Sequence, residues 1–491
     1  MAQDEPSTSD ATHSPRILYP LDSRPPLQRA VVLGIQHVLT MFGATVSVPL
    51  LFQQPLAMSP AELATLISSV MICSGVATIL QVTIGSRLPI IQGVSFSFLA
   101  AFFACIAFAK ANPIEGVSQG ALSMRYIAGA IIIGSMVEIV VGFSGVIGKL
   151  RKVVTPVVIG PVIMLIGLAL FEHGAPKAGT HWPVGGATIA LVTLFSLVLA
   201  HRHRVFRTLP VLLAVGCVWL VCMVLSVSGV WATGHPAFVD FSGLGATPWL
   251  RVNLFWGDHP VLLPWGMPKV ALGLVIAVLA GFLASMIESF GDYHGAAAMA
   301  EAPPPTDKQI SRGIGSEGLG CLCTGLLGGF SSTSYSENIA LIGLTRVASR
   351  YVVFVAAFVL ITLGTLAKFG AVVATIPGPV VGGLYCALFG LIAAVGIQQL
   401  AKADLYSQRT LYIAGFSLFM GLSVPKWFGG SIYGNGTEVV RQALEPTLAS
   451  VVVSLGSTGM GVAAILGLLL DNLIPGTDKE RGIGVDEPSR R

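Results

Sequence analysis

The segment Ser331–Arg346, SSTSYSENIALIGLTR, places seven hydroxyl side chains, the Glu337 carboxylate, the Asn338 amide and an arginine between two apolar segments. A second pair of acids, Glu288 and Asp292 in LASMIESFGDYHGA, is spaced four residues apart and so lies on one face of a helix. Carboxylates accept charge-assisted hydrogen bonds, which are among the strongest in proteins. These acids are therefore candidates to bind a polar ligand or a proton.

The elements that must position these residues are membrane spans. The chain has 491 residues, of which 54% are hydrophobic and 11% charged, and its mean hydropathy is +0.79; soluble domains carry about 25% charged residues. Crossing a bilayer takes roughly 20 apolar residues, and no water satisfies backbone groups there, so the spans must be helices. We expect an all-α polytopic membrane protein with about fourteen crossings. The longest runs are Leu27–Phe52, Ala121–Ile147, Leu209–Val227, Arg350–Ile376 and Leu448–Ile474.

Acids within spans are costly unless paired or protonated, so each one marks a candidate functional position. The alternative for Glu288 and Asp292 is that their span ends near Ser289 and both acids meet cytoplasmic water, although Ala296–Ala300 continues apolar. Glu138, in SMVEIVV, is a further acid of this kind, and the sequence leaves open whether it serves a site or helix packing. Like charges that meet in one site hinder each other's ionisation, so we expect a bound proton at neutral pH.

Two of the spans are expected to be broken. Ile90–Phe103 (IIQGVSFSFLAAFF) and Gly328–Leu344 (GGFSSTSYSENIALIGL) carry glycine and hydroxyl residues ahead of an apolar run of half a span. Ser, Thr and aromatic residues favour extended backbone there, which membrane depth tolerates only inside protein or a polar cavity. We expect two short strands that pair, each followed by a half-helix whose N–H groups point at a ligand. Two re-entrant loops without a ligand are the alternative.

An internal repeat and the basic residues set the organisation. PVVIGPVIMLIG (Pro156–Gly167) and PVVGGLYCALFG (Pro379–Gly390) share six of twelve residues at an offset of 223. Seven crossings separate them, so the second copy is inverted, a common plan of secondary transporters. The positive-inside rule predicts that both termini are cytoplasmic. The predicted parts are an N-tail (1–26), a first repeat (27–227), an extracellular or periplasmic loop (228–267), a second repeat (268–474) and a C-tail (475–491).

Several motifs together resemble those of the nucleobase–ascorbate transporter family (nucleobase:cation symporter-2), from residue 28 to about 430. In SENIALIGLTR, four residues match the family signature at its spacing, while Ala340 stands where the family usually has Gly; the matches are Glu337, Asn338, Thr345 and Arg346. MIESFGDYHG resembles the acidic motif of the eighth span and QGVSFSF the strand of the third. Leu33–Phe52 resembles the first-span motif, with Gln36 and His37.

The resemblance implies a fold of fourteen transmembrane segments in a 7+7 inverted repeat, with spans 3 and 10 broken by short β-strands. It also implies a core domain (segments 1–4 and 8–11), a gate domain (segments 5–7 and 12–14), an elevator mechanism and a homodimer. The implied positions are substrate-binding Glu288, Glu337, Phe96, Ser336, Tyr335 and Ser95, proton-coupling Asp292, Glu288 and Glu337, motif residues Asn338, Thr345, Arg346, Gln36 and His37, and gating Tyr385 and Phe389.

Glutamate at the first motif position resembles the uracil carriers, whereas glutamine resembles xanthine and urate carriers and proline the ascorbate carriers. We therefore expect proton-coupled symport of uracil into the cell across a plasma or inner membrane. A purine such as xanthine, urate or guanine, or an ascorbate-like substrate, with proton or sodium coupling, is the alternative. A channel or an intramembrane enzyme is disfavoured, since no HExxH, GxSxG or paired Asp motif appears with suitable flanks and the polar residues cluster in the two broken spans instead of lining a continuous pore. We expect no metal, cofactor or nucleic-acid partner; the basic run His201–Arg204 is interpreted as a cytoplasmic loop.

Overall fold

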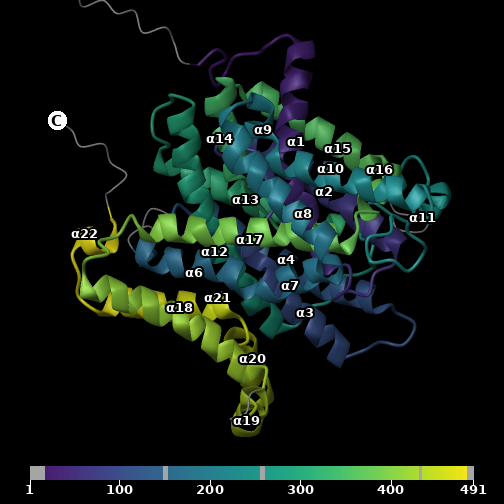
Figure 1. Ribbon diagram of the computed structural model, residues 1–491. Helices are drawn as coiled ribbons and strands as arrows, with labels where there is room; N and C mark the ends of the chain where they lie inside the picture. Colours follow the sequence, from purple (N-terminus) through teal and green to yellow (C-terminus); the bar gives the residue numbers. More distant parts are fainter. Residues whose placement is uncertain (1–16, 147–152, 255–259, 431–433, 484–491) are drawn as a thin grey trace, which may run out of the picture.

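The structure is built almost entirely of helices (Figure 1). The structure is a computed structural model and describes residues 17–146, 153–254, 260–430 and 434–483. Within these residues, eight helical stretches are long and apolar enough to cross a membrane by length and composition, and three shorter apolar helices accompany them. The structure is therefore that of a helical multi-span protein, while the count of fourteen crossings and the inverted 7+7 repeat stay predictions.

The first half contains α1 (Leu27–Phe52), α2 (Pro60–Thr83), β1 (Gln92–Val94), η1 (Phe96–Phe98), α3 (Leu99–Ala111), α4 (Gln119–Phe143), α6 (Pro156–Ala169), α7 (Phe171–Ala178), η2 (Gly179–His181), α8 (Trp182–Thr193), η3 (Leu194–Val198), η4 (Leu199–His201), α9 (Arg204–Thr208) and α10 (Pro210–Val227). After α11 (Ser242–Ala246), the second half contains α12 (Leu272–Met299), α13 (Asp307–Leu327), β2 (Ser332–Ser334), α14 (Ser336–Thr345), α15 (Arg350–Thr365), α16 (Ala367–Ala374), α17 (Gly378–Leu400), α18 (Gln408–Phe428), α19 (Gly436–Ala443), α20 (Pro446–Gly456), α21 (Gly459–Leu473) and α22 (Asp478–Arg481).

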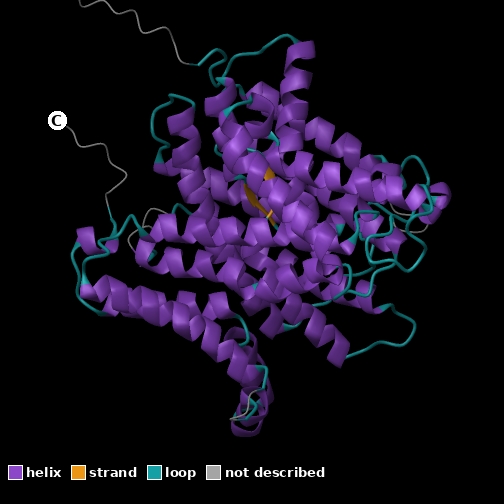
Figure 2. Cartoon of the chain, viewed as in Figure 1, coloured by secondary structure: helices purple, strands orange, loops and turns teal. Residues whose placement is uncertain are grey.

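The two predicted strands exist and pair with each other. Figure 2 shows them near the centre of the molecule, enclosed by helices. They run antiparallel, with Gly93 opposite Thr333 at the middle of the ladder, and every residue of both strands is buried. Gly93 has no room for a side chain, because a Cβ there would lie 2.5 Å from Cζ of Tyr335. The prediction of paired strands at the two broken spans is confirmed.

Helix ends deliver the chain to this sheet. α13 begins at a capping box in which the Thr306 hydroxyl accepts from the Gln309 backbone N–H and the Gln309 side chain accepts from that of Thr306. It ends at Gly328, whose φ of 71° lies in the left-handed region that favours glycine. α13 therefore stops just before β2, and α14 starts directly after it.

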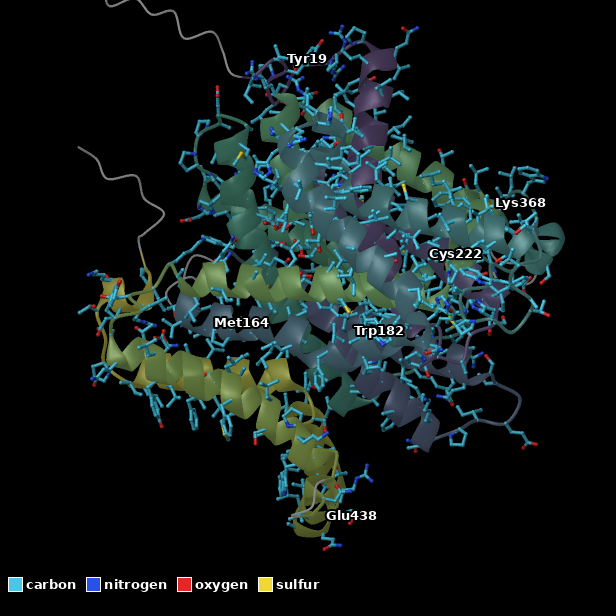
Figure 3. The ribbon with its side chains drawn as sticks, viewed as in Figure 1. Tyr19, Met164, Trp182, Cys222, Lys368 and Glu438 are labelled. Carbon is cyan, nitrogen blue, oxygen red and sulfur yellow. The ribbon has the colours of Figure 1, made fainter. Side chains whose placement is uncertain are left out.

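The repeated segments form a close helix pair. α6 begins at Pro156 and α17 at Gly378, and the two helices pack against each other. A Cβ on Gly167 would lie 2.3 Å from the carbonyl oxygen of Phe389, and one on Gly396 would lie 2.5 Å from the backbone nitrogen of Met164; Met164 is labelled in Figure 3. Small residues let helices in membranes approach to backbone contact, which explains Gly167 in the first copy and Gly396, which follows the second.

Two apolar runs that the sequence presents as single spans are divided. Arg350–Ile376 breaks at Leu366, whose ψ of 87° leaves the helical region, and Leu448–Ile474 breaks between α20 and α21. At the first break the outer segment supplies hydrogen bonds: Arg251 N donates to the Thr365 carbonyl (2.8 Å) and Ala367 N donates to the Trp249 carbonyl (3.1 Å). Part of the predicted loop 228–267 is thus fixed to the helices by its backbone.

Candidate functional site

One face of α12 is lined with polar groups and packs on β2. Asp292 is mostly buried and accepts two short hydrogen bonds, from the hydroxyls of Ser334 (2.7 Å to Oδ2) and Ser336 (2.7 Å to Oδ1). α12 continues to Met299. The helix therefore does not end near Ser289, and Asp292 is buried rather than open to water; it joins α12 to the start of α14.

Glu288 lies one helical turn before Asp292 and faces the other broken span. Its Oε2 is 3.5 Å from the hydroxyl of Ser97, in η1, and the side chain is half-buried. It also interacts electrostatically with Asp292 and with Glu337. The three predicted acids are thus brought together beside the strand pair.

Glu337 stands in the first turn of α14, where the helix dipole favours a negative charge. Ser336 and Glu337 are exposed, whereas β2 and Tyr335 just before them are buried. The chain therefore reaches accessible surface at the N-terminus of this half-helix. The first N–H groups of a helix have no intrahelical acceptor, so the amides at the starts of η1 and α14, Phe96 and Ser336, are suited to receive a ligand's acceptor atoms.

The predicted aromatic residues divide into two groups. Half-buried Phe96 meets Phe389 of α17 edge-on, with ring centroids 6.4 Å apart, and Phe389 stacks on Tyr385 at 5.1 Å. Tyr385 is fully buried and donates to the Ser47 carbonyl of α1 (2.9 Å). Tyr335 is also buried; its hydroxyl donates to the Val94 carbonyl (3.0 Å) and accepts from Thr45 (3.2 Å). Tyr335 therefore braces β1, and a contact of its ring with a ligand stays a prediction.

The remaining predicted residues fix the ends of the broken spans. The Ser95 hydroxyl accepts from the backbone N–H of Ser97 (3.2 Å) and caps η1. The buried Asn338 amide donates to the carbonyl of His37 (2.9 Å) and so ties α14 to α1. Gln36, the neighbour of His37, is half-buried on α1.

The end of α14 is held by the last two motif residues. The Thr345 hydroxyl donates to the Leu341 carbonyl (2.8 Å) and accepts from the Val347 N–H (3.3 Å). Arg346 takes a left-handed conformation (φ 59°) at the C-cap, and its carbonyl accepts from the N–H of Leu18 (2.8 Å). Thr345 and Arg346 thus shape the end of the half-helix, away from the acids at its start.

Sequence reasoning missed Glu317 of α13. This side chain is 1% exposed and accepts from the hydroxyls of Ser285 (2.8 Å), Ser289 (2.6 Å) and Tyr293 (3.2 Å). The sequence feature that could have revealed this residue is an acid within the glycine-rich stretch GIGSEGLGCLC, which lies between the segment of Glu288 and Asp292 and the broken span Gly328–Leu344. The many glycines and serines of α13 lower its hydropathy, so it does not stand out as an apolar span.

A multi-span helical protein whose polar site lies where two spans are broken has the architecture of a membrane transporter. Residues 28–430 match a family model described as Permease family. The chain is 35% identical over 507 residues to Solute carrier family 23 member 1 of Mus musculus, covering 95% of this chain and 82% of that protein. It is 36% identical over 417 residues to Nucleobase-ascorbate transporter 1 of Arabidopsis thaliana, covering 84% and 80%. The chain belongs to the nucleobase–ascorbate transporter family.

Solved structures share the fold at low identity. The anion transporter Solute Carrier 26 family member A9 from mouse, in its inward-facing state, aligns with a TM-score of 0.60 at 12% identity, over 92% of this chain and 69% of that one. The transmembrane domain of the cyanobacterium bicarbonate transporter BicA aligns with a TM-score of 0.53 at 14% identity, over 80% and 95%. The family consists of transporters, so the prediction that the chain is not an enzyme is confirmed by its membership.

Proposed function

We propose that this chain is a proton-coupled symporter that carries a neutral nucleobase, with uracil as the first substrate, into the cell. The observation that carries the proposal is the hydrogen bond between Asp292 of α12 and Ser336 of α14 (2.7 Å), which puts Glu288, one turn before Asp292, and Glu337, next to Ser336, at one site beside the strand pair. A uracil ring presents alternating N–H donors and C=O acceptors on a flat edge. The two carboxylates accept from the ring N–H groups, and the helix-start amides of Phe96 and Ser336 donate to its carbonyls.

The geometry favours a neutral ring over an anion. Three acids, Glu288, Asp292 and Glu337, interact with one another at the site, and an anion such as ascorbate would add a further negative charge among them. The name of the Arabidopsis relative covers both nucleobases and ascorbate. A purine such as xanthine presents N–H and C=O groups like those of uracil, so it is the second candidate.

Coupling to protons follows from the same acids. Several carboxylates that meet in one partly buried site cannot all be ionised at little cost, so binding a proton stabilises the loaded site. Sodium is the alternative coupling ion. In this proposal spans 1–4 and 8–11 move as a core domain against a gate domain that carries Tyr385 and Phe389, in a homodimer with both termini cytoplasmic.

Uptake into proteoliposomes tests the proposal. Labelled uracil and labelled xanthine are compared with and without an imposed proton gradient, in sodium-containing and sodium-free buffer. We expect saturable uptake of uracil that collapses when the gradient is removed and does not require sodium. Non-saturable flux that ignores the gradient would instead indicate a channel.

A further inference from the structure

A row of four oxygen atoms connects Asp292, in the candidate site, to a further buried acid, Glu317 of α13. Asp292 Oδ2 is 2.7 Å from the Ser334 hydroxyl, which is 2.9 Å from the Ser289 hydroxyl, which is 2.6 Å from Glu317 Oε2. All four side chains are at least nine-tenths buried. The row therefore runs from α12 through β2 back to α12 and ends on α13.

Counting hydrogens gives the condition under which all three contacts of this row are hydrogen bonds. Its three contacts are all within hydrogen-bond range, and each bond needs one hydrogen. The hydroxyls of Ser334 and Ser289 supply one hydrogen each, so they fill two contacts. The third contact is a hydrogen bond only when Asp292 or Glu317 is protonated. The two acids are thus the two ends of a path that one proton can occupy.

Glu138 of α4 lies beside the inner end of this path. It is 1% exposed, and within the described residues neither carboxylate oxygen has a hydrogen-bond partner. It interacts electrostatically with Glu317, and the other titratable groups it affects are Tyr293 of α12 and Cys321 of α13. α4 and α13 are in backbone contact here, since a Cβ on Gly318 would lie 2.9 Å from the Ile139 nitrogen. A second buried charge next to Glu317 is costly, so this acid pair favours holding a proton.

We propose that Glu317 and Glu138 form a proton-holding pair, which is loaded from Asp292 through Ser334 and Ser289. Protonated Asp292 gives its proton to the Ser334 oxygen, Ser334 gives its own to Ser289, and Ser289 gives its own to Glu317. One O–H bond breaks and one forms at each hydroxyl, so the net change is one proton moved from Asp292 to Glu317. Rotation of the two hydroxyls then resets the path. The coupled proton is in this way separated from the ligand by the strand pair.

This inference rests on the proposed function, and α12 offers a matched pair of variants to test it. Ser285 and Ser289 are both buried, lie one turn apart and each donate one hydrogen bond to Glu317, but only Ser289 also contacts β2, at the hydroxyls of Ser334 (2.9 Å) and Thr333 (3.2 Å). Two quantities are measured in proteoliposomes: exchange of labelled uracil at equal concentrations and pH on both sides, and accumulation driven by a proton gradient with proton influx followed by a dye. Labelled xanthine replaces uracil if that is the base the wild type accumulates.

We expect Ser289→Ala to keep exchange within about twofold and to lose gradient-driven accumulation and proton influx at least tenfold. Ser285→Ala is expected to change exchange and accumulation in the same proportion, and Ser289→Thr, which retains a hydroxyl, to restore coupling. Glu138→Gln is expected to move the pH midpoint of uptake to more acidic values, because it removes the group that disfavours charge on Glu317.

The outcomes separate this inference from the function on which it rests. If the wild type accumulates base with protons but Ser289→Ala and Ser285→Ala behave alike, the relay is wrong and the symporter stands. If Ser289→Ala has lost exchange, the Ser289→Thr variant decides, because it keeps a hydroxyl at this position. If Ser289→Thr does not restore coupling, the relay is also wrong. An unchanged pH profile in Glu138→Gln removes Glu138 from the pair. A wild type without proton-driven accumulation overturns the proposed coupling and the relay together.

Discussion

Three residues after the end of β1 the chain carries Ser97, and three residues after the end of β2 it carries Glu337. Both positions belong to the first turn of the helix that follows, and both interact with Glu288. The backbone of the two broken spans is thus alike. The side chains differ. The first span carries Phe96 and the Ser97 hydroxyl, which lies 3.5 Å from Glu288 Oε2. The second span carries the Glu337 carboxylate and the Ser336 hydroxyl, which lies 2.7 Å from Asp292 Oδ1.

This difference teaches that the strand pair and the ligand contacts are separate requirements. Gly93 opposite Thr333 allows the two strands to meet, and it carries no chemistry of its own. Of the two broken spans, only the second carries a carboxylate at this position, Glu337, which we propose binds the ligand. Substitutions in the second span should therefore affect transport more than those at the matching positions of the first.

Glu337→Gln is expected to have the largest effect, with uracil uptake lost. A charge-assisted hydrogen bond contributes roughly 1.5–3 kcal/mol, so the apparent affinity should fall at least about tenfold. Initial rates of labelled uracil uptake over a concentration series, normalised to the amount of protein in the membrane, measure it. Unchanged uptake would remove Glu337 from the site.

Asp292→Asn is expected to reduce uptake by about tenfold, since an amide cannot accept from both Ser334 and Ser336 as the carboxylate does. Ser336→Ala is the control, because it removes one of these two bonds and leaves the acid in place. Its effect should be the smaller one. An Asp292→Asn protein with normal proton-driven uptake would contradict both the link between α12 and α14 and the loading of the relay from Asp292.

Gly93→Ala tests the shared backbone and should act on stability. The added Cβ meets the Tyr335 ring at 2.5 Å, and overpacking of this kind costs about 1–3 kcal/mol. The melting temperature of the purified protein should fall. Gly390→Ala on α17, where a Cβ meets nothing within 4 Å, should leave it unchanged or slightly raised. Equal melting temperatures for both variants would contradict the tight contact at the strand pair.

Phe96→Ala is expected to raise the apparent KM for uracil by about fivefold, because an aromatic contact contributes roughly 1 kcal/mol. The maximal rate should change less, since no proton-binding group is removed. A KM that stays at the wild-type value would place the ring away from the ligand.

Ser97→Ala should have the smallest effect, about twofold or less, because the hydrogen bond it loses is long at 3.5 Å. When Ser97→Ala and Glu337→Gln are measured in one uptake series, their losses of uptake show directly whether the two broken spans contribute unequally. Comparable losses in both variants would mean that the two half-helices contribute equally.

The strand pair could be predicted because local composition decides it. Glycine and hydroxyl residues ahead of a half-length apolar run occur twice in the chain, at Ile90–Phe103 and Gly328–Leu344, and both places became strands. The grouping of Glu288 and Asp292 on one helical face followed from their spacing alone. These features depend on residues within a few positions of each other.

What the sequence did not reveal depends on contacts between distant segments. The division at Leu366 is stabilised by backbone bonds from Trp249 and Arg251, more than a hundred positions away. Glu317 accepts hydrogen bonds from hydroxyls on another helix, α12, and its neighbours in the chain do not indicate this contact. The environment of Glu138, which the sequence left open, likewise required the packing of α4 on α13.

The most direct test of the account is competition against labelled uracil uptake by methylated uracils. Methylation at ring N1 or N3 removes one N–H donor, whereas thymine keeps both donors and adds its methyl group to carbon. If the two carboxylates Glu288 and Glu337 read the ring N–H groups, 1-methyluracil and 3-methyluracil should each compete at least about tenfold more weakly than uracil, and thymine much less weakly. Equal competition by uracil and both N-methyl analogues would contradict the account.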